Sequence, residues 1–283
     1  MKHFSIYLTG LLLILSACKS AVKERTDEIY SRHLQKHVKL SIISTPLPSE
    51  KSDMNLLLLN DGQEMKNLRV REIVDSLYSK KLIQPLIIVG IHSGDRMQEF
   101  GVAGIPDYKN QGSKADKYAM FIDNELYAFV KKKVSVRKFR SVVMAGYSLG
   151  ALSAFDIAWD HSDKIDKVGV FSGAFSWRDK DANAAEYSDD KNRIIINKIR
   201  SSRKKPHLQY WFYAGGKEET GDRDKDGIID VIDDTRDLVE LIKSKNVCSS
   251  DDIVYTEDSN GIHDAVSWSH HFAEFLVWAF GRR

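Results

Sequence analysis

The chain has 283 residues, of which 42% are hydrophobic and 29% charged, and its formal net charge is +2. This composition is ordinary for a globular protein, and the length suits one α/β domain or two small ones. The near balance of charge gives no reason to expect nucleic acid or an acidic macromolecule as a partner.

Residues 1–17 are predicted to be a lipoprotein signal peptide. A weakly basic start precedes an apolar stretch over residues 8–15, which is too short to cross a membrane. The four residues that end at Cys18 read Leu-Ser-Ala-Cys and resemble the bacterial lipobox, in which a lipid is attached to the cysteine sulfur. We therefore expect an anchor to the membrane through the Cys18 lipid, in the bacterial cell envelope, either periplasmic or on the outer-membrane surface. An ordinary signal peptide with an incidental cysteine is the alternative.

A tether is expected over residues 18–27 and one folded domain over residues 28–283, in which strands and helices alternate. Such alternation predicts an α/β fold with a mostly parallel sheet and helices on both faces. Residues 92–115 form a long polar loop, and residues 179–203 are a candidate lid. Strands are expected within 28–45 and over 54–59, 86–91, 142–145, 167–171, 209–214 and 252–256, with helices at 70–77, 118–132, 265–280 and directly after residue 148.

Four apolar residues lead directly into the sequence Gly-Tyr-Ser-Leu-Gly at residues 146–150, and an apolar helix pattern follows. A serine on a sharp turn between a buried strand and a helix is typical of the nucleophile elbow of hydrolases. The flanking glycines suit a place where strand and helix backbones approach closely. Ser148 is therefore the predicted nucleophile; a plain strand-to-helix turn is the alternative.

A serine nucleophile needs a base, which is itself oriented by an acid. His263 lies between the last predicted strand and the last helix, where it can reach the serine, whereas His270 and His271 lie inside that helix. The acid is expected after the strand at residues 209–214. Glu218 is preferred there, and Glu219 and Asp222 remain alternatives.

Two backbone N–H groups should stabilise the negative charge that develops on the substrate oxygen. One is expected from Leu149, the residue after the nucleophile. The other is expected from Gln63, in the loop after the strand at residues 54–59. The Asn-Asp-Gly sequence at residues 60–62 is also compatible with a plain tight turn.

Residues 222–233 match the ligand pattern of an EF-hand-type calcium loop, with a glycine at the sharp turn. An aspartate occupies the last ligand position, where the pattern usually has a glutamate. A structural Ca²⁺ is the hypothesis, and a solvated acidic loop is the alternative. The ligands would be Asp222, Asp224, Asp226, the carbonyl of Ile228, Asp230 and Asp233.

These motifs together resemble the esterase branch of the α/β-hydrolase superfamily that includes esterase D-like enzymes, feruloyl esterases and enterobactin-type siderophore esterases. The resemblance covers nearly all of the mature chain. It rests on the oxyanion loop at residues 58–63, the R-x-x-E segment at 91–100, the elbow at 146–150, the strand end at 171–177, and the acid and base loops at 215–218 and 261–263.

The resemblance implies the α/β-hydrolase fold and a serine carboxylesterase that needs no cofactor for catalysis. The substrate would be a small-molecule or oligosaccharide ester, linked to a carbohydrate, an aryl group or a siderophore. Arg96, Trp177 and Trp268 would line its pocket, although packing around the site also accounts for the two tryptophans. For Arg96, a structural ion pair with Glu99 is the alternative. Acyl transfer to an alcohol and a non-catalytic lipoprotein that binds glycans or siderophores are the competing functions.

Overall fold

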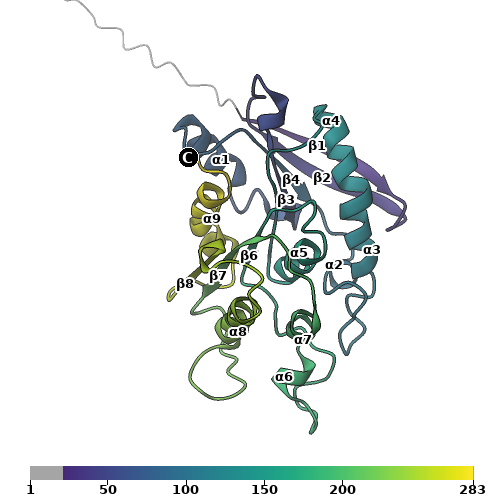
Figure 1. The fold of residues 1–283 in the computed structure, drawn as a ribbon, viewed down its shortest axis with the longest axis vertical. Coiled ribbons are helices and arrows are strands. Elements are labelled where there is room, and N and C mark those ends of the chain that lie inside the picture. The colour runs from purple at the N-terminus through teal and green to yellow at the C-terminus, as the bar shows by residue number, and fades with distance from the viewer. Residues whose placement is uncertain (1–21, 283) are drawn as a thin grey trace, which may run out of the picture.

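Within residues 22–282, which the computed structural model describes, eight strands form one sheet in the order β1-β2-β4-β3-β5-β6-β7-β8 (Figure 1). β2 pairs antiparallel with β1 and β4, and all other neighbouring strands are parallel. The predicted signal peptide and Cys18 lie outside the described residues. The strands are β1 (Lys23–Ser31), β2 (Lys36–Ser44), β3 (Asn55–Asn60), β4 (Leu86–Ile91), β5 (Val142–Tyr147), β6 (Lys167–Phe171), β7 (Gln209–Gly215) and β8 (Ile253–Asp258).

Helices cover both faces of the sheet, as predicted (Figure 1). α1 (Val70–Ser79) and α9 (Ala265–Phe280) pack on one face. The opposite face carries α3 (Ala115–Met120), α4 (Tyr127–Val134), α5 (Leu149–Asp160), α7 (Ile194–Ser201) and α8 (Asp230–Ser244). A π-helical segment (Phe121–Leu126) joins α3 to α4, and α2 (Arg96–Glu99) and α6 (Asp189–Asn192) are short.

Period-two alternation explains why the central strands are apolar throughout. In β3, Leu56 and Leu58 belong to the core on the α5 side, whereas Leu57 and Leu59 belong to the core beneath α1 and α9. Successive side chains of a strand point to opposite faces, so a strand covered on both faces needs apolar residues at every position. The mostly parallel α/β sheet predicted from these runs is confirmed.

The predicted tether boundary is wrong, because β1 already begins at Lys23 and pairs with β2 along its length. β1 lies at the edge of the sheet, and most of its first residues are charged and exposed. Charged side chains suit an edge strand, since they discourage pairing with other chains, but they remove the apolar signal that reveals a strand. Residues 23–27 therefore belong to the domain.

Helix α8 begins at Asp230, inside the segment that the sequence predicts as a calcium loop. Residues 230–233 consequently form its first turn. Within residues 22–282, no helix combines the length and apolar character needed to cross a membrane.

Candidate active site

Ser148 occupies a strained position between β5 and α5. Its φ of 54° and ψ of −123° lie in a region that residues with a side chain rarely adopt. The close approach of strand and helix requires the flanking glycines: an added Cβ at Gly146 would lie 2.3 Å from the carbonyl oxygen of Gly150. The turn thus has the geometry predicted for a nucleophile elbow.

His263 and Glu218 form an acid–base pair beyond the ends of β8 and β7. Nδ1 of His263 lies 2.8 Å from Oε2 of Glu218, and the carboxylate side chain is only 1% exposed, against 40% for the imidazole. A carboxylate can only accept, so Nδ1 donates this hydrogen bond, and in the neutral form of the imidazole the lone pair is on Nε2. Such a neutral imidazole can act as a base at Nε2.

The other predicted candidates lie elsewhere. Glu219 accepts a hydrogen bond from the N–H of Val231 at 2.9 Å rather than contacting His263. His270 is exposed, whereas Nε2 of His271 lies 3.4 Å from Oδ2 of Asp258. Asp222 lies in the acidic loop.

The second oxygen of Glu218 is held by two donors. Ser172 Oγ donates to Oε1 of Glu218 at 2.5 Å, and the N–H of Gly215 donates to the same atom at 2.6 Å. The indole N–H of Trp268 donates in turn to Ser172 Oγ at 2.8 Å. The predicted strand end at residues 171–177 includes Ser172, but the sequence predicts no role for that residue. Its position directly after β6, between the strands that precede Ser148 and Glu218, is the available signal.

Neither tryptophan lines the cavity that contains Ser148. The ring of Trp268 packs edge-on against His263, with ring centroids 5.0 Å apart, and its N–H is bonded to Ser172. The indole of Trp177 packs against the backbone of Gly101 and Gly112. Trp268 therefore contacts the acid–base pair, and Trp177 fills space beneath the long polar loop.

A cavity of about 320 Å³ opens beside the elbow. Ser148 and His263 both line it, so the predicted nucleophile and the predicted base face one space large enough for part of a small substrate. The remaining lining residues are Ser172, Gly173, Ala174, Ser176, Glu218, Glu219, Val231 and Asp234.

The two predicted oxyanion donors lie in the first turns of helical segments. Leu149 is the first residue of α5, and Gln63 lies in a single 3-10 turn (Gly62–Glu64) directly after β3. The first N–H groups of a helix have no partner within it and can bind an anion. Gly62 is needed there because an added Cβ would lie 2.2 Å from the carbonyl carbon of Gly90.

Arg96 is paired with Asp61. Its Nε and Nη2 donate to the two carboxylate oxygens of Asp61 at 2.9 and 3.1 Å, and Nη2 also reaches the carbonyl oxygen of Tyr147 at 3.3 Å. Glu99 instead contacts the ammonium group of Lys36. The predicted pocket residue Arg96 thus connects the oxyanion loop to the end of β5, and it is not among the described residues that line the cavity.

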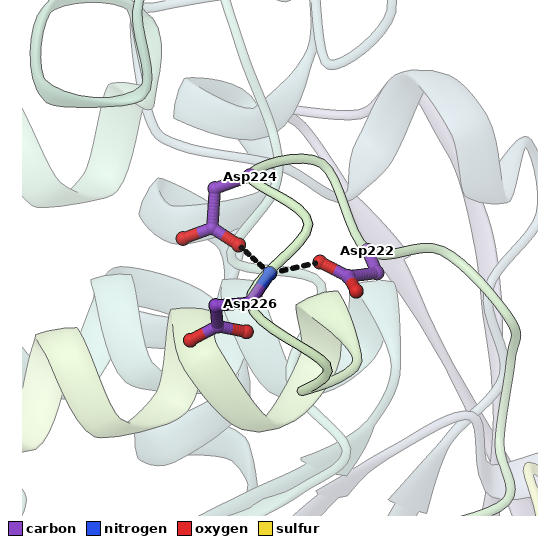
Figure 2. Close-up of side chains that lie close together, drawn as sticks. All are labelled: Asp222, Asp224 and Asp226. Atoms are coloured by element: carbon purple, nitrogen blue, oxygen red, sulfur yellow. Dashed lines mark hydrogen bonds between the residues drawn. The ribbon is translucent and has the colours of Figure 1, made fainter.

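The acidic loop brings three of its predicted ligands together. Ligand atoms of Asp222, Asp224 and Asp226 all lie within 4.8 Å of one another, and the N–H of Asp226 donates to the other two carboxylates (Figure 2). Asp230 is not part of this group and is bonded to Arg223, whose Nη1 lies 2.9 Å from Oδ2 and whose backbone N–H donates to Oδ1 at 2.9 Å. Ile228 donates its N–H to Asp226 at 2.8 Å.

Asp233 lies close enough to Asp224 and Asp226 for their negative charges to affect its ionisation. Burial, followed by repulsion from Asp226 and Asp224, raises the pKa of Asp233 to about 6. The predicted loop therefore concentrates negative charge on one side of the N-terminal turn of α8.

A strained serine between a strand and a helix, a carboxylate-paired histidine after the last strand and this strand order define an α/β-hydrolase. The model of the family described as "Putative esterase" matches residues 31–279. The chain belongs to this family of carboxylic ester hydrolases.

Comparisons with individual proteins agree with this fold. An uncharacterized protein of Bacillus subtilis, YjcH, is 23% identical over 77% of this chain and 83% of its own length. The enterobactin esterase of Shigella flexneri superposes with a TM-score of 0.69 at 17% identity, over 90% of this chain but only 59% of the enterobactin esterase. The BES protein of Bacillus cereus has a TM-score of 0.66 at 17% identity and covers 99% of this chain and 100% of its own. A ferulic acid esterase gives 0.67 at 16% identity, over 92% of this chain and 98% of its own. At these identities the structural likeness establishes the fold.

Proposed function

We propose that the protein is a serine carboxylesterase that acts through Ser148, His263 and Glu218. His263 Nε2 accepts the proton of the Ser148 hydroxyl as Oγ attacks the ester carbonyl, and then delivers that proton to the departing alcohol. The resulting acyl-enzyme is hydrolysed by water, which His263 deprotonates in the same way. The observation that carries this proposal is the 2.8 Å contact of His263 with Glu218 at the cavity that Ser148 also lines.

The N–H groups of Leu149 and Gln63 are proposed to stabilise the tetrahedral intermediate. Both lie in the first turn of a helical segment, where N–H groups have no partner within the segment, and the dipole of α5 adds to the attraction at Leu149. The ion pair of Arg96 with Asp61 supports the loop that carries Gln63 and also contacts the last carbonyl of β5. This arrangement keeps the two donors in a fixed relation to the nucleophile.

The substrate is proposed to be an ester on a carbohydrate, an aryl group or a siderophore. The structural neighbours described above include an enterobactin esterase and a ferulic acid esterase, which supports this range. Acyl transfer to an alcohol remains the alternative reaction, because the same acyl-enzyme serves both outcomes.

The deciding experiment is fluorophosphonate labelling of a form that begins at Lys19, read by intact mass beside the Ser148→Ala variant. One adduct on the wild type and none on the variant would establish an activated serine. A folded wild-type protein that takes no adduct would instead favour a non-catalytic binding lipoprotein.

We further propose that Cys18 carries the lipid anchor. Only residues 19–22 separate Cys18 from the first residue of β1, so an anchored domain would sit close to the membrane surface. Cys18→Ser should move the protein from the detergent-extracted fraction to the aqueous fraction, and the mass of the native protein should include the lipid. A native mass without a lipid would end this proposal.

The acidic loop is proposed to bind a structural Ca²⁺. The convergence of Asp222, Asp224 and Asp226, together with the EF-hand-type spacing, supports it. Added Ca²⁺ should raise the melting temperature of the wild type and leave that of Asp222→Asn/Asp226→Asn unchanged, with exposed Asp251→Asn as the control. Equal melting temperatures of the wild type in EDTA and in Ca²⁺ would count against a site.

A further inference from the structure

The wall of the active-site cavity carries two carboxylates that the proposed mechanism does not use. Glu219 follows the catalytic acid in sequence, and Asp234 lies on α8. Both line the cavity that Ser148 and His263 also line. These carboxylates bear on which ligands the cavity can bind.

Each of these carboxylates has one oxygen held by the protein. Oε1 of Glu219 accepts the N–H of Val231 at 2.9 Å. Oδ1 of Asp234 accepts from Arg193 at 2.7 Å and from Arg223 at 2.6 Å, and its side chain is 1% exposed. Among residues 22–282, no donor within hydrogen-bond distance is found for Oε2 of Glu219 or Oδ2 of Asp234. Glu219 is exposed, and both residues line the open cavity, so solvent can reach these oxygens when the cavity is empty. A ligand that displaces solvent from them must bring donors of its own, because an acceptor left without a donor in a complex is costly.

The arginines next to the cavity do not neutralise the negative charge of its carboxylates. The guanidinium groups of Arg193 and Arg223 are shared among four carboxylates, those of Asp189, Asp230, Asp234 and Asp237. Two positive charges thus face four negative ones, before Glu219 is added. Burial, and then repulsion from Asp230 and Asp234, raises the pKa of Glu219, which indicates the same negative potential.

We infer that Glu219 and Asp234 recognise hydroxyl groups of the substrate, so that the cavity accepts uncharged, hydroxyl-rich esters of a sugar or polyol and disfavours anionic esters. The inference rests on the proposed esterase function and narrows its substrate class. Hydroxyl groups donate strong hydrogen bonds to carboxylates, whereas a substrate carboxylate or phosphate would be repelled in this half-buried site. A substrate without donors would leave the acceptors unpaired, which is the usual basis of strong discrimination.

The test compares three acetate esters: 1-acetylglycerol, propyl acetate and O-acetyllactate. All three carry the same acetyl group. The alcohol part of 1-acetylglycerol has free hydroxyl groups, that of propyl acetate has no hydrogen-bond donor, and that of O-acetyllactate has a negative charge. The wild type should have a kcat/KM about tenfold higher for 1-acetylglycerol than for propyl acetate, and lowest for O-acetyllactate. Glu219→Gln keeps an oxygen that can accept from Val231 but removes the charge. It should reduce the preference for 1-acetylglycerol severalfold and raise kcat/KM for O-acetyllactate relative to propyl acetate.

Glu240→Gln, an exposed change of the same kind on α8, is the matched control and should preserve the wild-type ratios. Propyl acetate distinguishes the esterase function from the recognition of hydroxyl groups. Its hydrolysis requires the catalytic residues, but the ester has no donor for Glu219 or Asp234. Hydrolysis of propyl acetate with the same three-substrate ratios in the wild type and Glu219→Gln would overturn this inference and leave the esterase function standing. Hydrolysis of none of the three esters would overturn both.

Discussion

Trp268 and Glu218 bind the same hydroxyl group, that of Ser172: the indole N–H donates to Ser172 Oγ at 2.8 Å, and that hydroxyl donates to the carboxylate. Because the other oxygen of Glu218 lies 2.8 Å from Nδ1 of His263, a continuous chain of hydrogen bonds runs from α9 to the base. Glu218, the proposed acid, is thereby fixed on both oxygens, which favours one tautomer and one direction of the imidazole.

Trp268→Phe should lower kcat because it removes the indole N–H while retaining most of the aromatic packing against His263. The loss of one hydrogen bond in the positioning chain is worth about 1 kcal/mol, or roughly a fivefold decrease in kcat. KM for a small ester should stay near its wild-type value, since Trp268 does not line the cavity. Steady-state kinetics on propyl acetate measures both quantities.

Trp278→Phe on the same helix is the matched control, because Trp278 packs against Phe275 on α9 and away from His263. It should leave kcat unchanged. A raised KM with an unchanged kcat in Trp268→Phe would show instead that the indole contacts substrate, as the family resemblance implies.

Glu218→Gln should lower kcat by about 10³-fold or more, because the neutral amide cannot stabilise the imidazolium that forms when His263 takes the proton. The folded structure should persist, since the amide oxygen can still accept from Gly215 and Ser172. Glu257→Gln on β8, whose side chain is paired with Arg236, serves as the control. Near-normal turnover in Glu218→Gln, with loss of turnover in Glu219→Gln, would move the catalytic acid to Glu219.

The parts of this molecule that depend on local sequence were predictable. β5 and the start of α5 follow from an apolar run and flanking glycines, and Glu218 and His263 follow from their places after strands. The carboxyl ends of parallel strands share one edge of a sheet, so strand order alone brings such residues together.

The parts that depend on long-range pairing were not predictable. Arg96 was expected to form part of the pocket, but its partner Asp61 follows a different strand. The position of Ser172 directly after β6 places it at the edge of the sheet that carries Ser148 and Glu218, but nothing in the sequence indicates its hydrogen bonds to Trp268 and Glu218. The first residues of β1, 23–27, were assigned to the tether because an edge strand needs no apolar pattern. For Arg96 and Ser172 the deciding partner is far away in the chain, whereas β1 pairs with the next strand and lacks only the apolar pattern.

Arg96→Met should destabilise the protein by about 2–3 kcal/mol, because it leaves the nearly buried carboxylate of Asp61 without its cation. Because part of the Arg96 side chain is exposed to solvent, the expected loss of stability is at the lower end of the range for buried ion pairs. Urea unfolding measures it, and Asp61→Asn/Arg96→Met should recover part of the stability by removing the unpaired charge. An unchanged unfolding free energy with a raised KM would identify Arg96 as a substrate contact instead.

Lys198→Met should destabilise the protein in a pH-dependent way, because Lys198 on α7 contacts the buried carboxylate of Asp156 on α5. Burial raises the pKa of Asp156, although Lys198 and the N–H of Ala103 oppose this. A raised pKa in the folded state means that ionisation favours unfolding. The stabilising contribution is therefore complete below the unfolded-state pKa of about 3.9 and is lost as the pH rises through the folded-state value.

Removal of Lys198 raises the pKa of Asp156 further, so Asp156 stays protonated in the folded protein up to a higher pH. The pH at which its ionisation begins to destabilise the folded state rises accordingly. The variant should lose about 3 kcal/mol near neutral pH and much less near pH ~5. Urea unfolding across this range measures the difference, and Asp156→Asn/Lys198→Met should remove its pH dependence. Parallel stability curves for Lys198→Met and the wild type would contradict the assignment.

The ion pair of Lys198 with Asp156 also joins the end of the predicted lid segment to the site. Lys198 lies on α7, within that segment, and Asp156 lies on α5, which begins directly after Ser148.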